Sequence, residues 1–290
     1  MTSRQRLGGF AFVMPFIGAY SFLLILPFIM GVWISFHRAD LFGARQWIGL
    51  DNYIRLFADP IFYQAMGTTF TLALLIVPAL TAITLLLALA LNRATRSAAI
   101  FRGLFFSSSV LSVTIVTLIW RFVLTPDAGL IAKMLTAAGL EPIPFLSHPA
   151  LTVPAIAITT IWWGLGLPMM LFLAGLQQIP QDMYEAAALD RASRWTTFTR
   201  ITLPSLRRTT ILVVMLQTAA QLQIFGQAQL LTSGGPSGSS RPIVLYIYEI
   251  AFGRWELGYA VAAAEVLFVL VLALTLVQYW YSTRKDEAAR

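Results

Sequence analysis

Apolar residues gather in long runs along the chain, and short polar connections separate these runs. A helix needs ~20 apolar residues to cross the ~30 Å hydrocarbon core of a bilayer. Six runs reach that length, at residues 9–36, 64–91, 104–124, 150–176, 209–231 and 256–281. The first exceeds the apolar region of a secretory signal peptide, which predicts a retained span. We therefore expect an all-α integral membrane protein with six transmembrane helices in a single domain, residues 1–290.

The charges in the connections predict the orientation of these helices. Thirteen Lys and Arg residues lie in the two termini and in connections 92–103 and 177–208, whereas six lie in the alternate connections. Because positively charged loops stay on the cytoplasmic side, both termini and connection 177–208 are predicted to be cytoplasmic. Contact with membrane lipid thus explains the net charge of +7, and no nucleic-acid partner is expected. A hydrophobic fraction of 58% and a mean hydropathy of +0.75 indicate a multi-pass membrane protein. We expect it in the cytoplasmic (inner) membrane.

Several kinds of catalytic and cofactor site are missing from the sequence. There is no cysteine, and His37 and His148 lie far apart, so neither a metal site nor a cysteine nucleophile is expected. No phosphate-binding loop of the G-x-x-x-x-G-K-[ST] type is present. A membrane enzyme is left as an alternative without a candidate site. We expect no catalytic residues and no cofactor bound by this chain.

Connection 177–208 is a long polar interruption with strong helix signals. Residues 181–189 are good helix formers after Pro180, and Pro204 permits a second short helix over residues 194–203. Small residues occupy positions 186–188, where a solvated helix usually carries Glu or Lys. The connection is therefore either a solvated cytoplasmic loop or a docking surface for a soluble partner, and its length and small residues favour docking.

A motif in this connection resembles that of a known family. The run Glu185-Ala186-Ala187-x-x-Asp190-x-Ala192, followed by Phe198, Ile201 and Leu203-Pro204, resembles the EAA loop of binding-protein-dependent ABC importers. Three further segments are similar to sugar permeases of the maltose and glycerol-3-phosphate type: Gly49-Leu50-Asp51-Asn52-Tyr53, Leu231-Thr232-x-Gly234-Gly235-Pro236 and Gly258-Tyr259-Ala260-x-Ala262. The resemblance covers nearly the whole chain and implies the fold of a type I importer permease.

The resemblance also implies partners and a mechanism. The chain is expected to pair with a second permease subunit, two ATPase subunits that use ATP and Mg²⁺, and an extracytoplasmic solute-binding protein. ATP binding would draw the docked loops together and drive alternating access for a sugar, an oligosaccharide or a glycerol-phosphate-type solute. The residues implied to contact the ATPase are Tyr184, Glu185, Ala186, Ala187, Asp190, Arg191, Leu203 and Pro204.

Arg191 departs from the family pattern, which usually has Gly at this position. Gly permits a sharp turn between the two short helices. With Arg191, either the turn uses an ordinary backbone conformation or the arginine adds a contact to the ATPase. The sequence leaves both alternatives open.

Polar and aromatic residues inside the spans suggest where a solute would bind. Thr160, Trp163, Gly164 and Leu167 share one helix face in the fourth run, and Gly164, Gly166 and Pro168 can break the helix beside a cavity. Gln217 and Gln221 share a face in the fifth run, whereas Gln223 and Gln227 fall on another. The resemblance places sugar contacts at Thr160, Trp163, Gly164, Leu167, Gln217 and Gln221. The competing interpretation is close helix packing.

Glu265 is an isolated carboxylate about nine residues into the sixth run. A carboxylate at that depth is costly and rarely faces lipid. It would bond a substrate hydroxyl or a neighbouring helix. An ion-coupled secondary carrier that uses Glu265 as its proton site is the alternative function.

Overall fold

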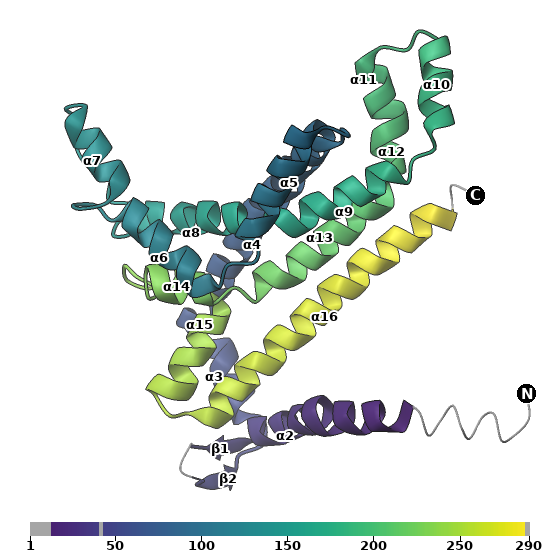
Figure 1. Ribbon diagram of the computed structural model, residues 1–290. Helices are drawn as coiled ribbons and strands as arrows, with labels where there is room; N and C mark the ends of the chain where they lie inside the picture. The colour runs from purple at the N-terminus through teal and green to yellow at the C-terminus, as the bar shows by residue number, and fades with distance from the viewer. Residues whose placement is uncertain (1–12, 41–42, 288–290) are drawn as a thin grey trace, which may run out of the picture. The chain divides into compact units, whose positions relative to one another are not determined.

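The computed structural model describes residues 13–40 and 43–287, and most of them are helical (Figure 1). The chain divides into two compact units. The first unit comprises Met1–Phe62 and Tyr246–Leu270, and the second comprises Tyr63–Leu245 and Val271–Arg290. Each unit is described by itself below.

The first unit holds the helix Val13–Ser35, which contains η1 (Ser21–Ile25) and α2 (Leu26–Ser35). A two-stranded antiparallel sheet follows, with β1 (His37–Ala39) and β2 (Arg45–Trp47) paired so that His37 faces Trp47. The helix α3 (Asp51–Ala58) follows the sheet within connection 37–63. The unit also contains η3 (Glu249–Gly253). It includes the first residues of α4 (Pro60–Leu91), the last residues of α15 (Ile243–Tyr248) and the first part of α16 (Leu257–Glu287).

The second unit contains most of the remaining helices. Its elements are α4 (Pro60–Leu91), α5 (Arg96–Ser108), α6 (Val113–Leu124), α7 (Leu130–Ala137), α8 (Pro149–Trp163), α9 (Gly166–Gln177), α10 (Gln181–Leu189), α11 (Arg194–Thr197), η2 (Phe198–Thr202), α12 (Leu203–Ser205), α13 (Arg207–Leu222) and α14 (Gly226–Leu231). α15 (Ile243–Tyr248) begins in the second unit and ends in the first. α16 (Leu257–Glu287) begins in the first unit and ends in the second.

Two buried apolar clusters hold the second unit together. One joins Leu72, Ile76 and Leu80 of α4 to Ile156 of α8 and Ala228 of α14. The other joins α4 and α9 to α13 through Ala88, Met169, Phe172, Leu206 and Val213. These contacts fix α8, α9, α13 and α14 around the cavity described below.

Three of the six expected runs are candidate membrane spans, and two more qualify if each bent helix pair is counted as one span. Val13–Ser35, Pro60–Leu91 and Leu257–Ser282 are single helices of sufficient length. The pairs α5–α6 and α8–α9 would each form one span bent by 97° and 49°, respectively. The run 209–231 is interrupted between α13 and α14 and does not meet the same criteria. A span there, and the total of six, stay predictions.

The third run is not the continuous helix that the sequence predicted over residues 104–124. α5 ends at Ser108, and α6 begins after Ser112, whose side chain accepts a hydrogen bond from the Ile115 N–H at 3.4 Å. Serine hydroxyls favour such caps because they satisfy backbone donors that lack a helical partner. The serine-rich stretch thus ends one helix and begins the next.

Candidate functional site

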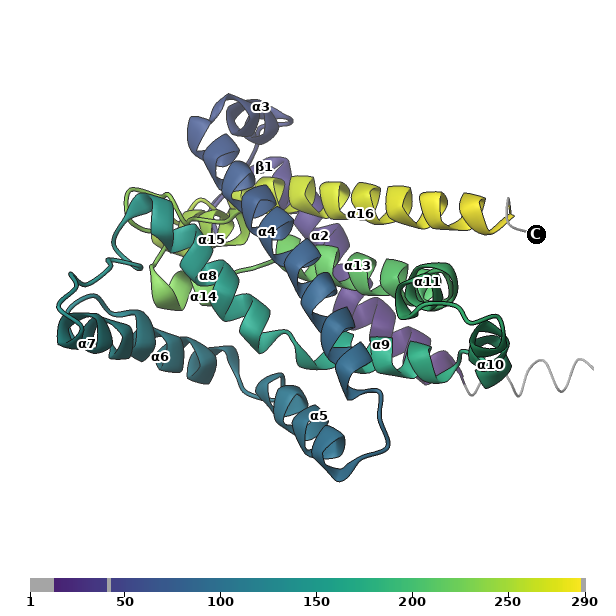
Figure 2. The ribbon, with the colours of Figure 1, turned by 90° about the horizontal axis from the view of Figure 1, so that it is seen from above.

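A cavity of about 490 Å³ lies in the second unit, beside the breaks between α8 and α9 and between α13 and α14. Figure 2 shows α8, α9, α13 and α14 from above. Six of the seven residues proposed from the sequence for solute binding line it: Thr160, Trp163, Gly164, Leu167, Gln217 and Gln221. The structure therefore brings together the two polar faces that the sequence placed in different helices.

The break between α8 and α9 occurs at the glycines where it was expected. α8 ends when the Gly164 N–H bonds the Thr160 carbonyl at 2.9 Å, and α9 begins at Gly166. A Cβ atom added at Gly166 would meet the backbone of Phe105 and Phe106 of α5 within 3.1 Å. Glycine is required here because α9 approaches α5 too closely for a side chain.

Trp163 is hydrogen-bonded to the connection between α5 and α6 through both its indole and its backbone carbonyl. Its Nε1–H donates to the Leu111 carbonyl at 3.0 Å. The Ser109 hydroxyl donates to the Trp163 carbonyl at 3.2 Å and accepts from the Gly166 N–H at 3.1 Å. Ser109 thus bonds both sides of the α8–α9 break and also lines the cavity. Sequence reasoning missed this residue, although the serine cluster was a signal for it.

The glutamines converge on the cavity because α13 ends at Leu222. Gln221 is 7% exposed and donates from Nε2 to the Gln217 Oε1 at 3.2 Å. The prediction that Gln223 and Gln227 lie on a different face is wrong, because both line the same cavity. That prediction assumed a continuous helix, whereas Gln223 leaves the helical conformation and α14 begins at Gly226.

Glu265 lies in the first unit, where it lines a separate pocket of about 480 Å³ with Phe28, Tyr53 and Phe57. A Cβ atom at Gly31 of α2 would lie 3.3 Å from the Glu265 Oε1. This close approach fits a carboxylate packed between α2 and α16. A contact between Glu265 and the solute stays a prediction.

The connection predicted to bind the ATPase folds as two short helical segments that stand side by side in Figure 1. α10 covers Gln181–Leu189 as expected, and α11, η2 and α12 together cover the expected second helix. The Tyr184 hydroxyl and the Thr202 Oγ1 lie 3.0 Å apart and join the two segments. Ala187 is buried, whereas Glu185 and Ala186 are exposed. We refer to residues 181–205 as the coupling segment.

Arg191 adopts a left-handed backbone conformation with φ of +51°. The Ala192 N–H bonds the Ala187 carbonyl at 2.9 Å, and the Arg191 N–H bonds the Ala188 carbonyl at 3.1 Å. These two bonds form a Schellman motif, whose left-handed residue is usually Gly. The alternative of an ordinary backbone conformation at Arg191 is therefore wrong. The arginine occupies the turn in the conformation that glycine would adopt.

Two apolar side chains of the coupling segment are highly exposed. Leu189 is 86% exposed and Trp195 is 72% exposed. Neither was proposed from the sequence, because the family motif does not include them. They enlarge the apolar surface that the small residues of α10 present.

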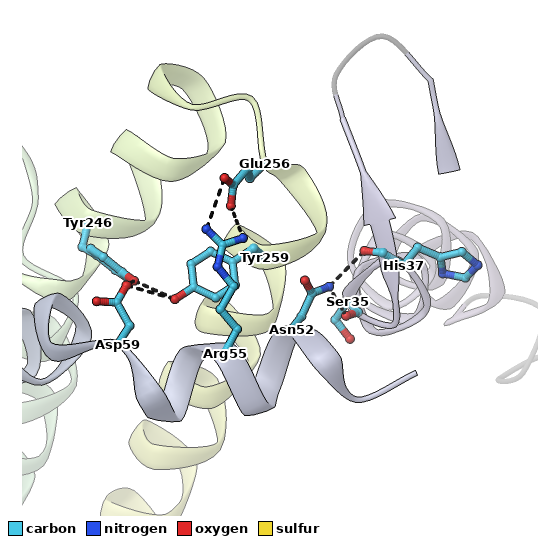
Figure 3. Close-up of polar contacts among 8 residues, drawn as sticks. All are labelled: Ser35, His37, Asn52, Arg55, Asp59, Tyr246, Glu256 and Tyr259. Carbon is cyan, nitrogen blue, oxygen red and sulfur yellow. Dashed lines mark hydrogen bonds and ion pairs between the residues drawn. The ribbon is translucent and has the colours of Figure 1, made fainter. Parts of the chain in front are cut away.

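A polar cluster in the first unit was also missed from the sequence (Figure 3). The Asp59 Oδ2 accepts hydrogen bonds from the hydroxyls of Tyr246 at 2.6 Å and Tyr259 at 3.1 Å. Arg55 forms an ion pair with Glu256 at 2.6 Å, and its guanidinium carbon lies 4.3 Å from the centre of the Tyr259 ring. The Asn52 amide donates to the carbonyls of Ser35 and His37.

The contacts in this cluster shift the pKa values of Asp59 and Tyr246. Burial raises the pKa of Asp59, but hydrogen bonds from Tyr246, the Ile61 N–H and Tyr259 outweigh it, so the pKa lies below its usual value. Burial, followed by the hydrogen bond to Asp59, raises the pKa of Tyr246. Asp59 is therefore a carboxylate and Tyr246 a neutral phenol at neutral pH. The cluster connects α3 to α15 and α16.

Comparisons with known proteins agree with these features. The family described as "Binding-protein-dependent transport system inner membrane component" matches residues 10–287. The chain is 33% identical to a probable ABC transporter permease protein, YesP of Bacillus subtilis, over 98% of this chain and 94% of that protein. It is 32% identical to the trehalose/maltose transport system permease protein MalF of Thermococcus litoralis, over 94% of this chain and 93% of that protein.

A solved structure supports the same assignment. A chain of a bacterial ABC transporter involved in the import of the acidic polysaccharide alginate has a TM-score of 0.87 and 26% identity. The match covers 97% of this chain and 96% of that chain. The chain therefore belongs to the family of inner membrane components of binding-protein-dependent transport systems.

Proposed function

We propose that this inner-membrane permease subunit moves a carbohydrate through the cavity at the α8–α9 break. Relatives named for trehalose and maltose, for lactose and for alginate transport support a carbohydrate as cargo. The family consists of transport subunits, and ATP is hydrolysed by a separate subunit. The chain is thus a transport component and not an enzyme.

The observation that carries this proposal is the composition of the cavity. Trp163 offers an aromatic ring on which a pyranose can stack, and Gln217 and Gln221 offer amides that can bond hydroxyls. A volume of about 490 Å³ is in the range of small-molecule sites. The cavity combines apolar lining residues, such as Val113 and Leu167, with a few polar groups, and this combination suits sugar recognition.

The experiment is sugar uptake into proteoliposomes that contain the assembled importer and its solute-binding protein. Gln221→Leu removes one hydrogen-bonding amide and is expected to lower uptake roughly three- to tenfold. Gln229→Leu is the matched control, because Gln229 lies in the next helix and does not line the cavity. Equal uptake by the two variants would contradict a sugar site at this place.

The coupling segment is proposed to bind the ATPase on the cytoplasmic side. The partners are a second permease subunit, two ATPase subunits that use ATP and Mg²⁺, and an extracytoplasmic solute-binding protein. A periplasmic protein carrying an alginate pentasaccharide is bound in a related solved complex, which supports the last of these partners. Closure of the ATPase dimer would move two coupling segments together and change which side of the membrane the cavity faces.

The docking proposal is tested with Glu185→Lys, which reverses an exposed charge on α10. We expect ATP hydrolysis without transport, or failure to assemble with the ATPase. Glu141→Lys reverses another exposed charge, in the connection predicted to lie on the opposite side of the membrane, and should leave both activities intact. Normal coupled uptake by Glu185→Lys would exclude the proposed contact.

A further inference from the structure

A groove of about 410 Å³ lies where the coupling segment joins α13 and meets the end of α16. All of its residues belong to the second unit. The lining residues used below are Leu203, Pro204, Arg207, Gln278, Tyr281 and Ser282. We call this site the α13–α16 groove. It combines apolar walls with a guanidinium, an amide and hydroxyl groups, and no carboxylate lines it among residues 13–40 and 43–282, whose side chains the structure describes.

The groove lies at one end of a candidate membrane span. The apolar helix Leu257–Ser282 ends there, and the aromatic residues at that end, Tyr279, Trp280 and Tyr281, are more than half exposed. Tyrosine and tryptophan prefer the level of the lipid headgroups. The five arginines between residues 177 and 208 place this end on the cytoplasmic side under the proposed orientation. The groove is thus at the headgroup level of the inner leaflet.

The chemistry of the groove matches an anionic headgroup. The guanidinium of Arg207 can bond a phosphate through two N–H groups, and the hydroxyls of Tyr281 and Ser282 can add further donors. Leu203 and Pro204 provide the apolar contact that acyl chains require. Positive charge next to a span attracts anionic lipids of the cytoplasmic leaflet.

Gln278 gives an independent indication of the ligand. Its Nε2 donates to the Thr218 Oγ1 at 3.1 Å, whereas its Oε1 is buried and has no hydrogen-bond partner among the described side chains of residues 13–40 and 43–282. A buried amide oxygen without a donor is unfavourable. A headgroup hydroxyl, as in phosphatidylglycerol, can supply that donor. We infer that the α13–α16 groove binds the headgroup of one anionic phospholipid of the phosphatidylglycerol type.

This lipid would act on transport, because the groove contains two residues of the coupling segment. Leu203 and Pro204 lie on one wall, and α16 forms the other. A lipid between them holds the base of the coupling segment against the last helix. The site rests on the proposed orientation, and it makes coupling between ATP hydrolysis and transport depend on the lipid composition of the inner leaflet.

The test is native mass spectrometry of the assembled, detergent-solubilised importer, titrated with phosphatidylglycerol or with phosphatidylcholine of the same acyl chains. We expect the wild-type protein to bind phosphatidylglycerol in preference to phosphatidylcholine. Arg207→Gln should weaken phosphatidylglycerol binding roughly tenfold or more, as the loss of a charge-assisted hydrogen bond requires. Arg208→Gln is the matched control, because the adjacent Arg208 does not line the groove and should leave binding unchanged.

A second variant and a competition experiment complete the test. Ser282→Ala is a mild change and should weaken binding even if Arg207→Gln fails to assemble. An excess of inorganic phosphate should not displace the lipid, because the apolar walls also contribute to binding. Equal loss of binding in Arg207→Gln and Arg208→Gln, equal binding of the two lipids, or displacement by phosphate would overturn the proposal. Lipid binding is read without any cargo, so a failure of the sugar proposal would not affect the result.

Discussion

Arg191 can be replaced by glycine to test whether its left-handed conformation is strained. The Cβ atom of a non-glycine residue in this region costs about 1–2 kcal/mol, whereas glycine loses about 0.5–1 kcal/mol more conformational entropy on folding. Arg191→Gly should therefore stabilise the turn by about 0.5–1 kcal/mol. The two hydrogen bonds of the Schellman motif would be kept, since both involve backbone atoms.

Hydrogen exchange of the Ala192 amide measures this turn directly, because that N–H bonds the Ala187 carbonyl. A gain of about 0.5–1 kcal/mol slows exchange roughly two- to fivefold in Arg191→Gly. Arg191→Ala is the matched control: it also removes the side chain but keeps the Cβ atom, so exchange should stay at the wild-type rate. Equal exchange in the glycine and alanine variants would refute the strain argument.

The same pair of variants tests the contact to the ATPase that the sequence left open. If the Arg191 side chain contacts the ATPase, both variants lose coupled transport to the same extent. If the residue only completes the turn, Arg191→Gly keeps transport at the wild-type level. The two roles are thus separated by one uptake measurement.

Three further predictions concern the cavity and the polar cluster. Gly166→Ala should destabilise the permease by about 1–3 kcal/mol, read from thermal unfolding in detergent, because the added methyl meets the α5 backbone. Trp163→Phe should lower sugar uptake more than Trp162→Phe does, because Trp163 lines the cavity and its indole is held in place by the hydrogen bond to Leu111. Because the pKa of Asp59 is lowered in the folded protein, its stabilising contribution is complete above the unfolded value near 3.8 and is lost as pH falls through the folded value. Asp59→Asn should therefore remove part of the acid sensitivity of unfolding, and an unchanged pH profile would contradict this assignment.

The sequence predicted those parts of the fold that follow from local periodicity and composition. The apolar runs, the helix Gln181–Leu189 and the break near Gly164 were recognisable because each has its own signal in the residues. The cavity residues of two distant helices were grouped through the family resemblance. In the structure these residues line one cavity.

The features that were missed depend on contacts between distant segments. The break at residues 109–112 was hidden by the high hydropathy of the surrounding run. The ion pair of Arg55 with Glu256 joins residues about two hundred positions apart, and no periodicity reports such a pairing. The left-handed conformation of Arg191 was not foreseen, because intrinsic preference argues against it and the Schellman hydrogen bonds decide it instead.

The hydrogen bonds of Ser109 have a consequence for how the cavity can change shape. Ser109 bonds the last residue of α8 and the first of α9, and Leu111 accepts from the Trp163 indole. A change in the angle between α8 and α9 would therefore break these hydrogen bonds or move the connection between α5 and α6. A solute bound in the cavity and a movement of the coupling segment transmitted through α9 would then both affect the hydrogen bonds of Ser109 and Trp163. Ser109 therefore connects the lining of the cavity to α9, the helix that leads to the coupling segment.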